Sequence, residues 1–150
     1  MRSITSRVRL ALLLPALSCV DPTALVSRPS VPPDFGQHQQ QNSYSINAAD
    51  RTVYLTLVQV RGETGEPIRA FVQRMFKTAD SVNARRLVID LRSVTGGDAR
   101  LLAPLIRGVV TRERFVQVGG LYVVVGPRSF SPGQNAATLL QQYANPIFTQ

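Results

Sequence analysis

The chain has 150 residues, of which 44% are hydrophobic and 17% are charged, a balance typical of a globular domain rather than a disordered chain. Its formal charge is +8, but three arginines lie in the first nine positions, and 14 − 9 leaves +5 after Cys19. This excess is scattered and contains no run of basic residues interleaved with aromatic ones, so no nucleic-acid partner is expected.

Residues 1–20 have the order of a secretory signal peptide. A basic start, MRSITSRVR, precedes the apolar run LALLLPAL, which is too short to span a bilayer, and small residues then lead to Cys19. The position of Cys19 after Ala16-Leu17-Ser18 resembles a bacterial lipoprotein box, although Ala16 stands where leucine is usual. Two alternatives follow: Cys19 is lipidated, or the signal peptide is cleaved at another position. Both predict export to the periplasm or cell envelope, and lipidation of Cys19 would also tether the protein to the membrane.

Residues 21–45 are rich in Pro, Ser, Gln and Asn and lack apolar periodicity, which predicts a flexible linker. His38, the only histidine of the chain, lies in this linker, where no rigid element would hold it as a catalytic base. One histidine and one cysteine cannot form a metal-ligand set, and no cofactor is predicted.

Strands and helices are expected to alternate along residues 46–150. The run TVYLTLVQV at residues 52–60 predicts a mostly buried strand, because it is rich in β-branched residues. The continuous apolar stretch at residues 86–91 predicts a strand buried on both faces. Between them, apolar residues at helical spacing predict a helix: Ile68, Phe71, Val72, Met75, Phe76, Ala79 and Val82.

The second half continues in the same way. Apolar residues from Leu101 to Val110 recur at helical spacing, and Pro104 either kinks this helix or marks its first turn. The run LYVVV at residues 121–125 predicts a third buried strand, and Val116 with Val118 would form a short extra one. A helix is expected over residues 132–143, followed by a fourth strand from residue 147.

This alternation predicts an α/β fold with a largely parallel sheet, flanked by helices and joined by right-handed crossovers. In such sheets the loops at the carboxyl ends of parallel strands share one edge. The loop that contains Gly96 and Gly97 should therefore lie beside the loop of residues 129–131.

Two stretches, LVIDLRSVTGG at residues 87–97 and LYVVVGPRSFSPGQNAA at residues 121–137, resemble the tail-specific (carboxyl-terminal processing) serine proteases. This family, peptidase family S41, includes the tricorn core. The resemblance implies a ClpP/crotonase-like layered fold, with residues 46–150 as a partial catalytic domain. It also implies a peptide or protein as substrate.

The resemblance assigns roles to particular residues. The nucleophile of the family falls on Ser131, and the Gly-Gly pair that helps to form its oxyanion hole falls on Gly96 and Gly97. Asp90 and Arg92 match a pair in the family motif, with an expected structural role: a carboxylate and a guanidinium at a strand end can satisfy loop backbone groups and each other.

Three departures indicate an incomplete or inactive peptidase. Pro132 follows the nucleophile, where the family uses a backbone N–H as its second oxyanion donor, and proline has none. Gln134 replaces a glutamate of the family pattern. The family's general base is a lysine beyond the serine, whereas Lys77, on the polar face of an earlier helix, is the only lysine of this chain.

The two motifs also allow readings that involve no catalysis. Ser131 to Gln134 (SPGQ) are typical of a helix start, with a serine cap, proline at the first position and glutamine to complete a capping box. A non-catalytic peptide-binding or structural α/β module in the cell envelope is therefore the competing hypothesis. A phosphate loop at Gly96-Gly97-Asp98 ranks lower, since both nucleotide-binding spacings are absent.

Overall fold

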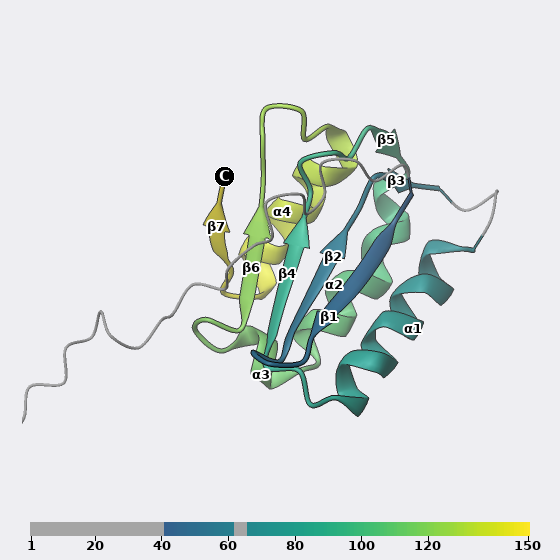
Figure 1. Cartoon of the computed structure of the whole chain (residues 1–150). Helices are drawn as coiled ribbons and strands as arrows, with labels where there is room; N and C mark the ends of the chain where they lie inside the picture. The colour runs from purple at the N-terminus through teal and green to yellow at the C-terminus, as the bar shows by residue number, and fades with distance from the viewer. Residues whose placement is uncertain (1–40, 62–65) are drawn as a thin grey trace, which may run out of the picture.

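The computed structural model describes residues 41–61 and 66–150, so the predicted signal peptide, Cys19 and His38 lie outside the described residues. Its centre is a five-stranded sheet with the order β1-β2-β4-β6-β7 (Figure 1). The strands β2, β4, β6 and β7 are parallel, and β1 pairs antiparallel with β2 at one edge. Their bounds are Ser43–Asn47 (β1), Thr52–Thr56 (β2), Arg86–Asp90 (β4), Leu121–Val124 (β6) and Ile147–Thr149 (β7).

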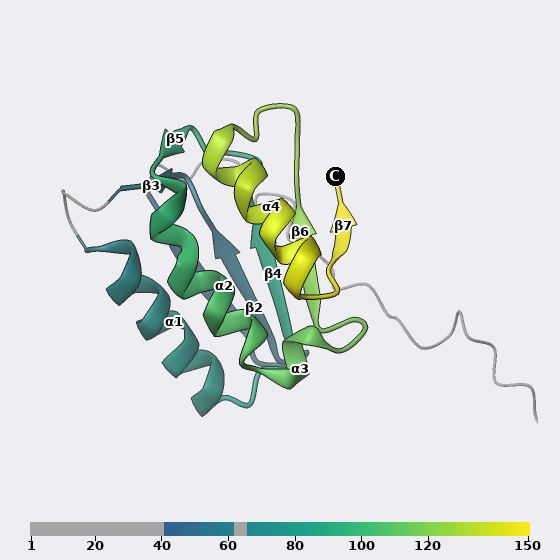
Figure 2. The same ribbon diagram turned by 180° about the vertical axis from the view of Figure 1, so that it is seen from behind.

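The described helices cover one face of this sheet (Figure 2). α1 connects β2 with β4, a helical segment connects β4 with β6, and α4 connects β6 with β7. The elements are α1 (Ile68–Ser81), a 3-10 helix η2 (Ala99–Leu102), α2 (Ala103–Val110), α3 (Glu113–Val116) and α4 (Ser131–Tyr143). The predicted α/β class with a largely parallel, helix-flanked sheet is confirmed. Within the described residues, no helix is long and apolar enough to cross a membrane.

β4 is buried on both faces, as its continuous apolar sequence predicts. Leu87 and Ile89 have no exposed surface and join the main core beneath the helices. Val88 belongs to a smaller cluster with Tyr54 and Tyr122 from the neighbouring strands. Each such aliphatic side chain stabilises the fold by about 1.5–3 kcal/mol through burial, so β4 contributes to the packing on both faces of the sheet.

The predicted strand at residues 52–60 is in fact two strands. β2 ends at Thr56, and β3 (Gln59–Val60) pairs in parallel with β5 (Gly96–Gly97) in a second, two-stranded sheet. The side-chain amide of Asn42 causes the break, because its Oδ1 accepts hydrogen bonds from the amides of Val58 (2.8 Å) and Gln59 (3.1 Å). These amides are consequently directed away from the main sheet.

β1 was not predicted, and its first three residues fall in the stretch assigned to the linker. Tyr44 and Ile46 alternate with polar residues and pack against the core. Tyr44 also contacts Phe71 of α1 edge to face, with ring centroids 5.8 Å apart. This alternation is a short strand pattern that the polar composition of its surroundings obscured.

The extra strand predicted at Val116 and Val118 is wrong. α3 forms there instead, because Phe115 inserts into the core with no exposed surface and lies 6.3 Å from the ring of Phe76. Val118 is 74% exposed and contributes to no strand. Pro104 lies in the first turn of α2, directly after η2, so it starts that helix and does not kink it.

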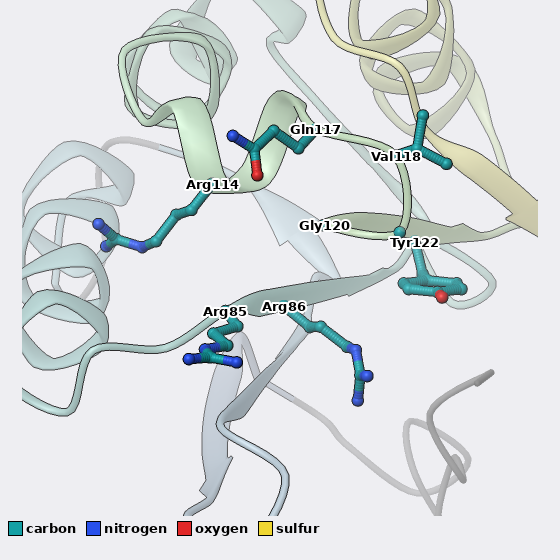
Figure 3. Close-up of a pocket in the computed structure, with 8 residues that line it drawn as sticks. Arg85, Arg86, Arg114, Gln117, Val118, Gly120 and Tyr122 are labelled. Carbon is teal, nitrogen blue, oxygen red and sulfur yellow. The ribbon is translucent and has the colours of Figure 1, made fainter. Parts of the chain in front are cut away.

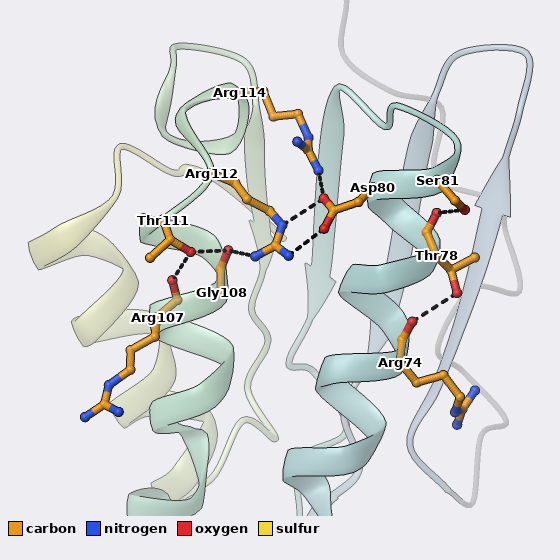
Figure 4. Close-up of polar contacts among 9 residues, drawn as sticks. All are labelled: Arg74, Thr78, Asp80, Ser81, Arg107, Gly108, Thr111, Arg112 and Arg114. Carbon is orange, nitrogen blue, oxygen red and sulfur yellow. Dashed lines mark hydrogen bonds and ion pairs between the residues drawn. The ribbon is translucent and has the colours of Figure 1, made fainter.

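Asp80 links the ends of three helices (Figure 4). Its carboxylate on α1 accepts hydrogen bonds from Nε (2.9 Å) and NH2 (2.7 Å) of Arg112, which follows α2, and it also pairs with Arg114 of α3. Hydrogen bonding from Arg112 is the main reason that the pKa of Asp80 is lowered to about 2. The folded state therefore favours the ionised carboxylate.

We expect Asp80→Asn to lower the melting temperature at pH 7. The folded-state pKa lies below the ordinary value of 3.8, so this stabilisation is present above pH 3.8 and is lost as the pH falls through about 2. Because the side chain is 43% exposed, solvent screening limits the loss to about 1 kcal/mol. Thermal unfolding between pH 2 and pH 7 measures it.

Glu113→Gln is the matched control, since its exposed carboxylate makes one side-chain contact in the described structure, 3.4 Å from Gln117. The variant should unfold like the parent chain. An Asp80→Asn variant whose stability falls as steeply with acid as that of the parent would contradict this assignment.

Candidate active site

The loops after β4 and β6 lie side by side at the carboxyl edge of the sheet, as predicted. The amide of Leu91 donates to the carbonyl of Val124 (2.9 Å), which extends the pairing of the two strands. Beyond it, the amide of Phe130 donates to the carbonyl of Val94 (3.2 Å). Backbone hydrogen bonds therefore hold the start of α4 against the loop that leads to the glycine pair.

Ser129 holds the loop after β6 in place through hydrogen bonds, a role that sequence analysis missed. Its hydroxyl donates to the carbonyl of Leu91 (2.9 Å) and accepts from the amide of Gly126 (3.0 Å). A serine three residues after the glycine of a Gly-Pro pair is the available sequence signal, because short hydroxyl side chains often close such turns. Its partner in the first loop could not be found from that signal.

Asp90 and Arg92 form an ion pair where β4 ends and the first of these loops begins. Asp90 has no exposed surface, and its Oδ1 accepts from the backbone amide of Arg92 at 2.9 Å. The guanidinium adds bonds from Nε (3.1 Å to Oδ1) and NH2 (2.7 Å to Oδ2). These hydrogen bonds raise the pKa of Arg92 and hold the turn after β4 in one conformation.

The two glycines form β5 and not an open turn, and only one of them is conformationally required. Gly97 has a φ of +131°, and a Cβ built on it would lie 2.0 Å from the carbonyl oxygen of Val60. A Cβ on Gly96 would meet nothing within 4 Å. Asp98 is the N-cap of η2, and its Oδ1 accepts a hydrogen bond from the amide of Arg100 (2.9 Å). Hydrogen bonds from the Arg100 side chain lower the pKa of Asp98.

Ser131 is the first residue of α4, and the predicted serine cap is wrong. Phe130 is the N-cap, because its carbonyl accepts from the amides of both Gly133 (2.7 Å) and Gln134 (3.4 Å). The helix makes no side-chain cap, so Ser131 and Gln134 do not form a capping box. The Ser131 side chain is exposed, and its hydroxyl makes no hydrogen bond within the described part of the chain.

Lys77, the one lysine of the sequence, does not lie beside this serine. Lys77 is exposed on α1, and α2 stands between α1 and α4 (Figure 2). Residues 41–61 and 66–150 contain no group of acidic, histidine or cysteine side chains that could hold a metal ion. The arrangement thus presents a hydroxyl at a helix start beside a glycine strand, with Lys77 on another helix.

Comparison with solved structures places the fold among known ones. A crystal structure from Bacteroides fragilis NCTC 9343, of a protein assigned to the S41 proteases, matches 72% of this chain with a TM-score of 0.52 and 13% sequence identity. The chain spans 37% of that protein's length. No protein-family model and no curated protein matches the sequence. The likeness shows a fold similar to that of an S41 protease.

We expect Gly97→Ala to destabilise the protein by about 2–3 kcal/mol. The substitution combines a backbone conformation that alanine rarely adopts with a clash against a backbone carbonyl that cannot rotate away. The free energy of unfolding in urea measures the effect.

Gly96→Ala is the matched control and should change the unfolding free energy by less than about 0.5 kcal/mol, because its Cβ enters open space. Equal effects of the two substitutions would show that β5 does not have this geometry.

Proposed function

We propose that this chain carries the nucleophile half of an S41-type serine peptidase site, with Ser131 as nucleophile and Gly97 as oxyanion donor. The Phe130–Val94 backbone hydrogen bond carries the proposal, because it holds the start of α4 beside the glycine strand. The similarity of the fold to an S41 protease supports it. A peptide is the proposed substrate class.

The position of β5 favours Gly97 as the donor. The amide of Asp98 donates to the carbonyl of Val60 (2.8 Å) and the amide of Thr95 to that of Val58 (3.0 Å), so backbone hydrogen bonds fix the chain on both sides of Gly97. A positive φ at this residue, which only glycine adopts readily, is part of the same geometry.

In the proposed reaction the Ser131 Oγ attacks the peptide carbonyl carbon, and its proton passes to a base outside the described residues. The carbonyl oxygen becomes an oxyanion held by the Gly97 amide. The C–N bond then breaks, the leaving amine takes up a proton, and water hydrolyses the acyl ester. Pro132 supplies no amide, and loss of one oxyanion donor costs about 10²–10³-fold in rate. We therefore propose that the chain by itself is inactive toward peptides.

The cellular setting is proposed from residues 1–20. Their basic and apolar order favours export to the periplasm or cell envelope, and lipidation of Cys19 would add a membrane anchor. A substrate peptide would then meet the site outside the cytoplasm.

Labelling with a fluorophosphonate tests the nucleophile. We expect slow labelling of Ser131 whose rate rises roughly tenfold per pH unit from neutral to alkaline pH, because hydroxide must replace the absent base. Intact-protein mass spectrometry measures the rate. Ser131→Ala should abolish labelling, and Ser81→Ala, which removes an exposed hydroxyl on α1, should leave it unchanged.

Absence of labelling over the whole pH range in folded protein would contradict the nucleophile assignment. A rate that levels off near neutral pH would instead show a resident base and contradict the proposed inactivity.

A non-catalytic peptide-binding module is the second candidate, and β7 is the observation that favours it. Among the described strands, β7 pairs with β6 alone. The carbonyl of Thr149 accepts from the amide of Val125 (3.0 Å), so by alternation the backbone of Phe148 faces the open edge. An extended peptide could add there as a further strand.

Binding of a labelled extended peptide, followed by fluorescence polarisation, distinguishes this candidate. Phe148→Pro removes the outward amide and should weaken binding about fivefold or more, whereas Ser131→Ala should have no effect. Equal binding by the parent chain and Phe148→Pro would reject the edge as the binding surface.

A further inference from the structure

The outer surface of the helix layer carries basic side chains without acidic partners. α1 and α2 lie side by side in this layer (Figure 2), and a depression of about 420 Å³ lies between them. Arg69 and Lys77 line it from α1 and Arg107 from α2, and all three side chains are exposed. In the described part of the chain, none of the three makes a side-chain hydrogen bond or an ion pair. These three residues define the basic face.

The acidic residues of the helix layer are already engaged. Residues 66–81 and 98–117 contain seven basic and four acidic residues, a formal charge of 7 − 4 = +3. Each acid has a partner in the same layer: Arg74 for Glu66, Arg112 and Arg114 for Asp80, Arg100 for Asp98, and Gln117 for Glu113.

The other described acids lie away from the basic face. Asp50 caps the turn before β2, and Asp90 is buried at the end of β4. Glu63 lies outside the described residues. The net charge of the helix layer therefore resides mainly on the three cations of the basic face.

The depression between the helices offers no open pocket for an anchoring side chain. Its floor is closed, since Val72 is 1% and Phe76 is 4% exposed. The Phe76 ring packs so closely on α2 that a Cβ at Gly108 would lie 2.0 Å from it. The guanidinium of Arg112 covers the same ring, 4.3 Å from its centroid. Protein partners gain much of their affinity from side chains that enter such pockets, so this surface offers charge without an anchor site.

The three cations also do not converge on one point. Arg69 and Lys77 are eight positions apart, about 12 Å along α1. Arg107 points away from α1 (Figure 4). A compact anion could not contact all three side chains, whereas separate headgroups of a lipid surface could each meet one of them.

We propose that the basic face binds an anionic membrane surface. Long, unpaired basic side chains near such a surface are attracted to its headgroups, and the attraction grows with each cation. One acyl chain alone binds a membrane reversibly, and stable anchoring takes a second signal such as a basic patch. The basic face would supply that second signal beside the proposed lipidation of Cys19.

Cosedimentation of the full chain with vesicles tests the proposal. The vesicles contain equal parts of phosphatidylglycerol and phosphatidylcholine, and phosphatidylcholine alone is the neutral reference. All proteins carry Cys19→Ser, so that no acyl chain contributes, and residues 1–20 are the same in each, so their contribution cancels between variants. We expect the partition coefficient to be about tenfold or more higher on the anionic vesicles, and to fall as salt screens the charges.

The double variant Arg69→Gln/Lys77→Gln should lower the partition coefficient on anionic vesicles about tenfold or more, because each cation near the surface contributes about fivefold. Arg85→Gln/Arg128→Gln is the matched control, since it removes the same charge from two exposed arginines at opposite ends of the sheet. Arg85 lies at the start of β4, where the neighbouring arginine side chains point in different directions (Figure 3). The control should change the partition coefficient less than about threefold. Far-ultraviolet circular dichroism confirms that each variant is folded.

Three outcomes would overturn the proposal. The first is equal binding to anionic and neutral vesicles, and the second is an equal loss in the two double variants, which would show an effect of net charge alone. The third is saturable binding of a fluorescein-labelled octaglutamate peptide without any preference for anionic vesicles, which would assign the face to an acidic protein segment. None of them bears on the labelling of Ser131, so the two proposals fail independently.

Discussion

The carboxylate of Asp90 is fully buried at the end of the central strand, and the path of the chain around the candidate site depends on its neutralisation. A buried carboxylate without partners costs several kcal/mol, so the backbone amide and guanidinium of Arg92 must stay close to it. This requirement fixes the turn after β4. The carbonyls of Leu91 and Val94 then face the second loop, where Ser129 and Phe130 bind them.

Support of the loops by Ser129 and by backbone groups leaves Ser131 without a structural role. A capping serine would have its hydroxyl bound to the helix it starts, and such a bond would compete with nucleophilic attack. Because Phe130 is the N-cap, this competition does not arise. This geometry supports the proposal that Ser131 is a nucleophile, whereas Pro132, which has no N–H, opposes turnover.

The elements that could be predicted from sequence are those stabilised by their own side chains. β4 and α1 bury contiguous or periodic apolar residues, so their patterns directly reflect the core. β3 could not be placed, because the break after β2 depends on Asn42, which lies 16 positions before its partner Val58. β1 was missed because its alternating Tyr44 and Ile46 lie in a polar stretch. The requirement for glycine at residue 97 likewise comes from Val60, across the two-stranded sheet. At the site, the sequence predicted which loops meet but not the N-cap or the Ser129 lock.

Charge shows the same distinction between local and distant contacts. At the carboxyl edge, Asp90 and Asp98 each pair with the arginine two positions later, so these two ion pairs follow from local sequence spacing. At the other end, Asp80 binds arginines 32 and 34 positions away, a pairing that no local sequence pattern predicts. This second group of ion pairs forms only because the crossovers bring the end of α1 next to α3 and to the residue that follows α2. A charge pattern that is local in sequence therefore predicts the ion pairs at the carboxyl edge, whereas the pairs of Asp80 depend on the fold as a whole.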